Sequence, residues 1–166
     1  DYQGAIADFN KAIAINPQYA TAYYNRGVAK KNLKDNQGAF ADYSKAIEIN
    51  PQYAAAYLIR GNTKDEIGDY QGAFADYSKA IEINPQYAAA YYNRGNIKVR
   101  DLGDYQGAID DFNKAIEINP QLALAYLNRG GVKGLSGDYQ AACLDFKKAS
   151  SLGSKNAKEL LNQFCQ

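Results

Sequence analysis

The chain repeats itself with a period of 34 residues. The tetrapeptide Ile-Asn-Pro-Gln recurs at residues 15–18, 49–52, 83–86 and 118–121, so that successive copies begin 34, 34 and 35 residues apart. Two further markers keep the same step: Asn-Arg-Gly at 25–27, 93–95 and 128–130, and Gly-Asp-Tyr-Gln at 68–71, 103–106 and 137–140. A fixed period of this length is typical of repeat architectures, in which each unit packs mainly on its neighbours.

Each period predicts two helices. In the second period we expect them over about residues 52–66 and 70–83. Pro51 would supply the fixed φ of a first helical turn. Gly68 and Asp69, between the two segments, combine a C-cap glycine with an N-cap aspartate.

The apolar spacing is that of helices. One stripe with a period of 3.6 residues contains Ala73, Phe74, Tyr77, Ala80 and Ile81. Small residues recur where two helices must approach closely: Gly27, Gly61, Gly95 and Gly130 in the first helices, and Ala39, Ala46, Ala73, Ala80, Ala108, Ala115, Ala142 and Ala149 in the second.

These features together resemble the tetratricopeptide repeat (TPR) family. The shared features are the period, an aromatic residue four positions before a glycine, the Gly-Asp-Tyr turn, the paired alanine columns and the closing proline. The resemblance covers nearly the whole chain and implies an all-α fold, a right-handed superhelical solenoid of antiparallel helix pairs. The chain departs from the family by having arginine where leucine usually precedes the glycine, and lysine three residues after that glycine.

The repeats divide the chain into segments. We expect a second helix without its first helix at 1–16, full repeats at 17–50, 51–84, 85–119 and 120–153, and a C-terminal capping helix at 154–166. The third repeat has one extra residue, placed within 98–102. This insertion predicts a longer turn, and a π-bulge is the alternative.

Composition argues against several kinds of chemistry. The chain has no histidine, so a Ser-His-Asp triad and a histidine metal site are excluded. Nineteen basic and eighteen acidic residues give a formal net charge of +1, which does not favour a nucleic-acid partner. No apolar run is long enough to enter a membrane. We therefore expect no enzyme activity, no cofactor and no metal.

The two cysteines are Cys143 and Cys165. Cys143 stands where other repeats have Phe40, Phe74 or Ile109, which predicts a buried structural thiol. A disulfide between the two cysteines is the alternative, but sequence alone cannot fix the Cβ geometry that it requires.

The resemblance implies a binding surface, because first helices line the concave face in this family. The expected partner is a protein or peptide, since asparagine amides can pair with a peptide backbone and Tyr and Leu offer apolar contact. The alternative is that these positions are merely solvated. The candidate groove residues are Tyr24, Asn25, Leu58, Asn62, Tyr92, Asn93, Asn96, Leu127 and Asn128.

Charged residues recur in register with the repeats. We expect structural ion pairs between Arg26, Arg60, Arg94 and Arg129 on the first helices and Asp42, Asp76, Asp111 and Asp145 on the second. The alternative is a basic ladder for an acidic partner, built from these arginines with Lys30, Lys64, Lys98 and Lys133. It requires the aspartates to face elsewhere.

The helix expected at residues 1–16 carries an apolar side that we expect to be exposed, formed by Ala5, Ile6, Phe9 and Ile13. Either further repeats precede Asp1 in the natural protein, or residues 1–16 mediate homo-oligomer formation. The sequence thus favours an interaction scaffold, with a self-associating structural module as the alternative function.

Overall fold

The computed structural model describes residues 1–165, and all regular secondary structure in this range is helical. The helices form two compact units, residues 1–85 and residues 86 onward, each of which has its own internal packing. The first unit contains α1 (Tyr2–Ile15), α2 (Ala20–Asn32), α3 (Asn36–Ile49), α4 (Ala54–Glu66) and α5 (Tyr70–Ile83). The second contains α6 (Ala88–Ile97), the π-helix η1 (Lys98–Leu102), α7 (Tyr105–Ile118), α8 (Ala123–Leu135), α9 (Tyr139–Ser151) and α10 (Lys155–Phe164).

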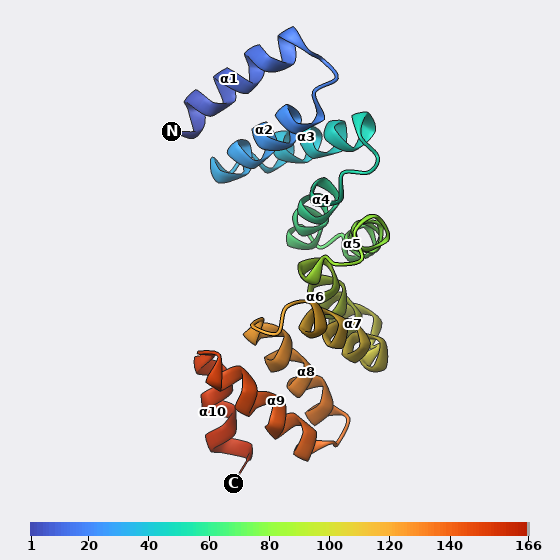
Figure 1. Ribbon diagram of the computed structural model, residues 1–166, viewed down its shortest axis with the longest axis vertical. Coiled ribbons are helices and arrows are strands. Elements are labelled where there is room, and N and C mark those ends of the chain that lie inside the picture. Colours follow the sequence, from blue (N-terminus) through green and yellow to red (C-terminus); the bar gives the residue numbers. More distant parts are fainter. Residues whose placement is uncertain (166) are drawn as a thin grey trace. The chain divides into compact units, whose positions relative to one another are not determined.

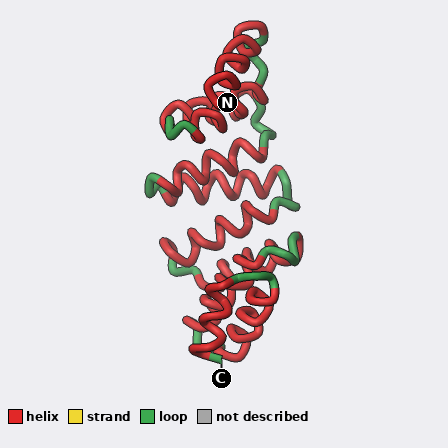
Figure 2. Tube along the Cα trace, turned by 90° about the vertical axis from the view of Figure 1, so that its left-hand side faces the viewer, coloured by secondary structure: helices red, strands yellow, loops and turns green. Residues whose placement is uncertain are grey.

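Helix pairs are the building blocks of both units (Figures 1 and 2). In the first unit, α2 packs on α3 and α4 on α5, while α1 covers α2 and α3 contacts α4. In the second unit, α6 packs on α7 and α8 on α9, α7 contacts α8, and α10 packs on α9. The fold is therefore an all-α repeat solenoid, as the sequence predicts.

The turn inside each helix pair has the expected capping. Gly68 adopts a left-handed φ of +82°, and the Asp69 side chain accepts a hydrogen bond from the Gly72 amide at 2.9 Å. These two features end α4 and begin α5. The third repeat differs, because its extra residue is absorbed by η1 before Gly103 rather than by a longer turn.

The first helix of the second repeat begins two residues later than the sequence predicts. α4 begins at Ala54, and Pro51 and Gln52 form a turn before it. This turn is held by Asn50, whose side-chain oxygen accepts from the Gln52 amide at 3.0 Å and whose carbonyl accepts from the Tyr53 amide at 3.1 Å. The asparagine before the proline therefore organises the link between repeats as an Asx-turn.

The core of each pair is an aromatic ring packed on a glycine. Tyr43, Tyr77, Phe112 and Phe146 are buried on the second helices. A Cβ added at Gly61 would lie 2.8 Å from Cε1 of Tyr77, and one at Gly130 would lie 2.8 Å from Cε1 of Phe146. The glycine column therefore exists because the facing ring occupies the space of a side chain.

The apolar side of α1 is less exposed than the sequence predicts. Ala5, Ile6, Phe9 and Ile13 are all half-buried, because α1 packs on α2. None of its residues is fully buried, however. Phe9 of α1 corresponds to Tyr43 of α3, which is buried. Among the second helices of this unit, which are α1, α3 and α5, α1 is therefore the least covered.

Candidate functional site

Each arginine before the glycine column is paired with the aspartate of the same repeat. Nε and Nη2 of Arg60 donate to the two carboxylate oxygens of Asp76 at 2.8 and 2.7 Å. Lys64 adds a second cation, with Nζ 3.0 Å from Asp76 Oδ2, and the guanidinium lies 5.6 Å from the ring centroid of Tyr57. The hydrogen bond to Asp76 raises the pKa of Arg60.

The same arrangement recurs in all four full repeats. The remaining pairs are Arg26–Asp42 with Lys30, Arg94–Asp111 with Lys98, and Arg129–Asp145 with Lys133. The aspartates are buried, so their charges are neutralised inside the fold rather than displayed. The alternative of a basic ladder needs aspartates that face elsewhere, and the structure does not meet that condition.

The arginines also link neighbouring repeats. Nη1 of Arg26 donates to Asn10 Oδ1 of α1 at 2.7 Å, and Nη1 of Arg129 donates to Asn113 Oδ1 of α7 at 2.6 Å. A planar guanidinium with five donors can hold a carboxylate on one side and a second acceptor on another. These charge columns are thus part of how the solenoid is stacked.

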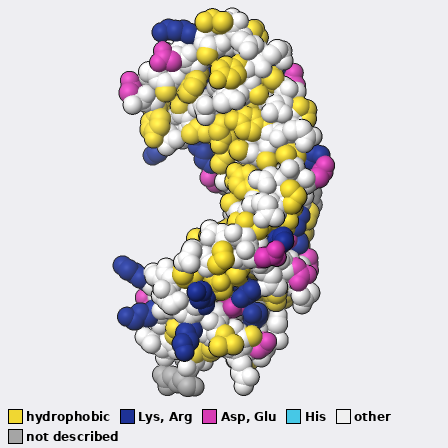
Figure 3. Space-filling view, viewed as in Figure 1, with side chains coloured by type: hydrophobic (Ala, Val, Ile, Leu, Met, Phe, Trp, Pro, Cys, Tyr) yellow, Lys and Arg dark blue, Asp and Glu magenta, His cyan; other side chains and the backbone are white. Residues whose placement is uncertain are grey.

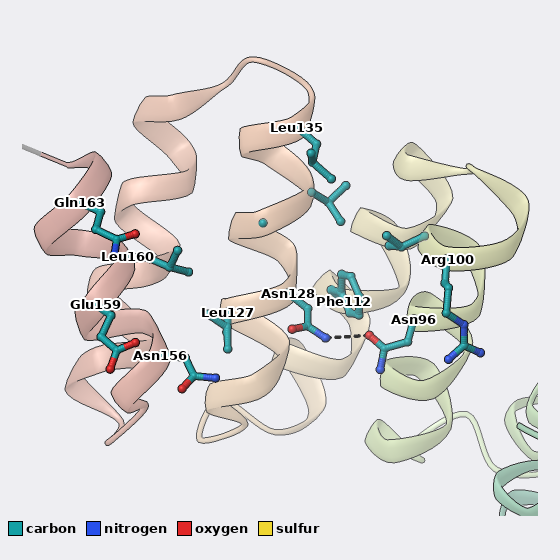
Figure 4. A pocket seen from close by; sticks show the side chains of 13 residues that line it. Asn96, Arg100, Phe112, Leu127, Asn128, Leu135, Asn156, Glu159, Leu160 and Gln163 are labelled. Carbon is teal, nitrogen blue, oxygen red and sulfur yellow. Dashed lines mark hydrogen bonds between the residues drawn. The ribbon is translucent and has the colours of Figure 1, made fainter. Parts of the chain in front are cut away.

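A pocket of about 760 Å³ opens in the second unit, between helices α6, α8 and α10. Its lining combines apolar side chains with amide and charged ones, many of which are labelled in Figure 4. The apolar residues are Val99, Phe112, Leu127, Val132, Leu135 and Leu160, and the polar ones are Asn96, Arg100, Asn128, Asn156, Glu159 and Gln163, with Gly131 between them. On the face of this unit drawn in Figure 3, in the lower part of the picture, several basic side chains lie among hydrophobic ones.

Two asparagines in this pocket are bonded to each other. Nδ2 of Asn128 donates to Asn96 Oδ1 at 2.7 Å and to the Tyr92 hydroxyl at 3.2 Å (Figure 4 draws the first bond). Asn128 uses its NH₂ group for these two bonds, so its side-chain oxygen is still able to accept a hydrogen bond. Asn96 uses its side-chain oxygen, so its NH₂ group is still able to donate one. If the amides are flipped together, with the Tyr92 hydroxyl as the donor, the roles exchange. Either way, the pair offers one donor and one acceptor.

The structure brings some candidate groove residues together and separates others. Asn96, Leu127 and Asn128 line the pocket, and Tyr92 contacts it through Asn128. Asn93 and Asn25 are half-buried on α6 and α2 and do not line it.

The first unit uses its corresponding positions for internal packing. Tyr24 contacts the rings of Tyr43 and Tyr53, with centroids 6.1 and 5.0 Å apart. Leu58 is 6 % exposed, so the expectation that it lines a groove is wrong, because it packs into the core. Asn62 accepts a hydrogen bond from the Tyr77 hydroxyl at 3.0 Å.

The structure joins Cys143 and Cys165 in a disulfide, with Cα atoms 5.7 Å apart. The expectation of a buried free thiol is therefore wrong. Cys143 is only half-buried on α9, and it faces the end of α10 rather than another repeat helix. The sequence could not decide this, because it does not tell how closely the last helix packs.

Sequence reasoning missed the contribution of α10 to the pocket. Asn156, Glu159, Leu160 and Gln163 of this helix form one wall. The available signal was the amphipathic pattern of the segment, which predicts a covering helix but not which surface its polar side borders.

Residues 1–165 hold no group of three or more His, Cys, Asp or Glu side chains arranged to bind a metal ion. Among the helices of this range, none is both long and apolar enough to cross a lipid bilayer.

Family models match most of the chain. A TPR repeat model matches residues 1–34, 66–101 and 98–133, and a tetratricopeptide repeat model matches residues 20–53. The chain belongs to the tetratricopeptide repeat family. Members of this family typically act as protein-interaction scaffolds and are not enzymes. No curated protein matches this TPR chain in sequence.

Solved structures share the TPR fold over nearly the full length. A crystal structure of MamA is 28 % identical, covers 95 % of this chain and 92 % of its own, and superposes with a TM-score of 0.83. The TPR protein YrrB is 20 % identical, with 98 % and 84 % coverage and a TM-score of 0.80, and pilF of Pseudomonas aeruginosa is 20 % identical, with 96 % and 72 % coverage and a TM-score of 0.86. At 20 % identity, the last two likenesses concern the fold alone.

Proposed function

We propose that this TPR protein is a non-catalytic scaffold whose second unit binds an extended segment of a partner protein in the pocket between α6, α8 and α10. The observation that carries the proposal is the amide pair Asn96–Asn128 among apolar lining residues. A peptide unit presents one carbonyl acceptor and one N–H donor, which is the complement of what this pair offers. YrrB, described as "a TPR protein with an unusual peptide-binding site", shows that a related fold binds peptides.

The apolar lining gives the proposed site its side-chain preference. Phe112, Leu127 and Leu160 surround a space large enough for a Leu, Met or Phe side chain. Burial of such a side chain would contribute about 1.5 to 3 kcal/mol to the binding free energy, and the amide pair would fix the direction of the backbone. The occupant is therefore a polypeptide segment with one large apolar residue, and the proposal includes no nucleic acid, membrane or cofactor.

Selection from a random peptide library on the wild-type protein tests this function. Peptides with a shared apolar residue should emerge, and Asn96→Ala combined with Asn128→Ala should weaken their binding by about 10- to 100-fold, the equivalent of two lost hydrogen bonds. Gln106→Ala is the matched control, since Gln106 is exposed on α7 and lies outside the pocket. Unchanged affinity in the double variant, with unchanged helicity, would refute this site.

Self-association through residues 1–16 is the second candidate. It is favoured by α1, whose Phe9 stays half-buried while the corresponding Tyr43, Tyr77, Phe112 and Phe146 of the other second helices are buried. Sedimentation velocity over a range of concentrations tests it. A concentration-dependent dimer that Phe9→Asp abolishes would support this candidate, and a monomer at every concentration would remove it.

A further inference from the structure

The Cys143–Cys165 disulfide connects the body of the second unit to one wall of the proposed binding pocket. Cys143 lies in α9, and Cys165 follows the last residue of α10, 22 positions later in the sequence. The helix α10 contributes Asn156, Glu159, Leu160 and Gln163 to the pocket, as Figure 4 shows. The bond therefore fixes the helix that forms this wall.

Without the bond, α10 is held by few contacts. Ala157 is its only fully buried residue, and the helix packs through Leu160 and Leu161 on the cluster of Ala142, Phe146 and Ala149. The preceding helix α9 buries four residues, by comparison. A ten-residue helix is not stable by itself in water, so its order depends on these contacts and on the covalent link at its C-terminal end.

The bond can be reached from solvent. Both cysteines are half-buried, and the adjacent Leu144 and Phe164 are 70 % and 67 % exposed. An incoming thiolate therefore has access to at least part of the disulfide, which is the requirement for thiol–disulfide exchange.

We propose that the Cys143–Cys165 disulfide is a redox latch that controls the pocket, an inference that rests on the proposed function. In the oxidised protein the latch holds α10 against α9 and keeps the wall in place. A dithiol reductant opens it in two steps. One thiolate attacks a protein sulfur and forms a mixed disulfide, and the second thiol of the reductant displaces the other cysteine. The protein gains two electrons and two protons, and the reductant becomes a disulfide.

Opening the latch frees the C-terminal end of α10, which then frays from Cys165 toward Leu160. Since the chain has only these two cysteines, reduction has a single target. The N-terminal end of α10 stays anchored, because Ala157 is buried in the cluster with Ala142, Phe146 and Ala149. The Ser154 side chain also caps this first turn through the Ala157 amide. Reduction therefore loosens the wall of the pocket without unfolding α6 to α9.

Hydrogen exchange measured by mass spectrometry tests the latch on the full chain. Amides of residues 158–165 should exchange about tenfold faster after dithiothreitol treatment, while those of α8 and α9 keep their protection. The Cys143→Ser, Cys165→Ser double variant should match the reduced protein and should not respond to dithiothreitol. Equal exchange of α10 in the oxidised and reduced wild type would overturn the latch, whatever the peptide results.

Binding of a library-selected peptide tests the functional consequence. Its affinity for the wild type should fall about tenfold on reduction, and the double variant should bind at the reduced level with or without dithiothreitol. Equal affinity in both redox states would also overturn the proposal. If no peptide is selected, the proposed function fails, and the exchange measurement still decides whether α10 is released.

Discussion

At the scale of single residues, the most informative position is the buried tyrosine of the first two full repeats. Tyr43 is fully buried, and its hydroxyl has no hydrogen-bond partner within residues 1–165. In the next repeat, the Tyr77 hydroxyl donates to Asn62, and Val28 stands at the position that corresponds to Asn62. Because Val28 replaces this asparagine, the Tyr43 hydroxyl lacks the hydrogen bond that the Tyr77 hydroxyl makes in the next repeat.

This difference predicts opposite effects of the same substitution. Tyr43→Phe should raise the free energy of unfolding by about 1 kcal/mol, because it removes a buried hydroxyl that pairs with nothing. Tyr77→Phe should lower it by about 1 kcal/mol, since it breaks the hydrogen bond that the Tyr77 hydroxyl donates to Asn62. Urea denaturation followed by circular dichroism measures both, and changes of the same sign would contradict this explanation.

The effect of Tyr43 also depends on pH. Burial is the main cause that raises the pKa of Tyr43 above its ordinary value of about 10. The unfolded chain therefore loses this proton at a lower pH than the folded chain, and the stability linked to it falls as pH rises above about 10. The advantage of Tyr43→Phe over the wild type should increase between about pH 8 and pH 11, and a constant difference would argue against it.

Residue types alone predict the charge pairs well and the hydroxyl pairs poorly. The Arg–Asp pair, of which Arg60 and Asp76 are one example, recurs in every full repeat. Such recurrence indicates a structural pair before any coordinates are known. The pairing of Tyr77 with Asn62 occurs once, so it carries no periodic signal. Leu58 illustrates a third case, because a leucine on a first helix fits a groove or a core equally well until its neighbours are placed.

At the scale of elements, the turns inside the helix pairs depend on a left-handed residue. Gly68, Gly103 and Gly137 have φ values of +82°, +62° and +86°, and the corresponding residue of the first full repeat, Lys34, has +65°. A residue with a Cβ pays about 1 kcal/mol or more for this conformation.

Substitution of glycine for Lys34 and of lysine for Gly68 should therefore change the stability in opposite directions. Lys34→Gly should stabilise the protein by about 0.5 kcal/mol, because the relief of backbone strain outweighs the extra freedom of glycine in the unfolded chain. Gly68→Lys should destabilise it by about 1 kcal/mol. Thermal denaturation of both variants checks the signs, and a stable Gly68→Lys protein would show that the turn tolerates any residue.

Element boundaries show where sequence reasoning stops. The start of α5 after Asp69 is predictable, since a capping aspartate marks it directly. The start of α4 is not, because Pro51 suits both a first helical turn and the turn before a helix. The extra residue of the third repeat is easily located at 98–102, but whether it lengthens a turn or forms η1 depends on the packing of Val99 and its neighbours.

At the scale of the whole molecule, the chain is a sum of locally packed repeats. The first unit has an apolar cluster around Ala46, Ile47 and Ala56, and the second has clusters around Phe112 and Phe146. The arginine bridges act between adjacent repeats, as Arg26 does with Asn10. Stability in such an array is set by each repeat and its nearest neighbours.

The pocket is a property of the assembled second unit, and this explains why it was only partly predictable. Asn96, Leu127 and Asn128 follow from the family resemblance, since they lie on first helices. The wall supplied by Glu159 and Gln163 does not, because it depends on how the last helix packs on α9. A repeat pattern predicts what its repeated positions do, but not what is added after the last repeat.

If stability is local, the destabilising effect of a core substitution should be confined to the unit that carries it. Gly61→Ala and Gly130→Ala each place a Cβ about 2.8 Å from an aromatic carbon of the facing helix. Overpacking of this kind costs about 1 to 3 kcal/mol, of which the better helix propensity of alanine recovers at most about 1 kcal/mol. Hydrogen exchange should therefore accelerate in α4 and α5 for the first variant, and in α8 and α9 for the second.

The matched pair separates local from global coupling. In a nearest-neighbour array, Gly61→Ala leaves the protection of α8 and α9 unchanged, and Gly130→Ala leaves that of α2 and α3 unchanged. Peptide binding in the proposed pocket should then be lost with Gly130→Ala, because α8 supplies Leu127 and Asn128, and kept with Gly61→Ala. If either substitution accelerated exchange equally in all helices, the molecule would unfold as one cooperative body, and a defect in the first unit would disable a site in the second.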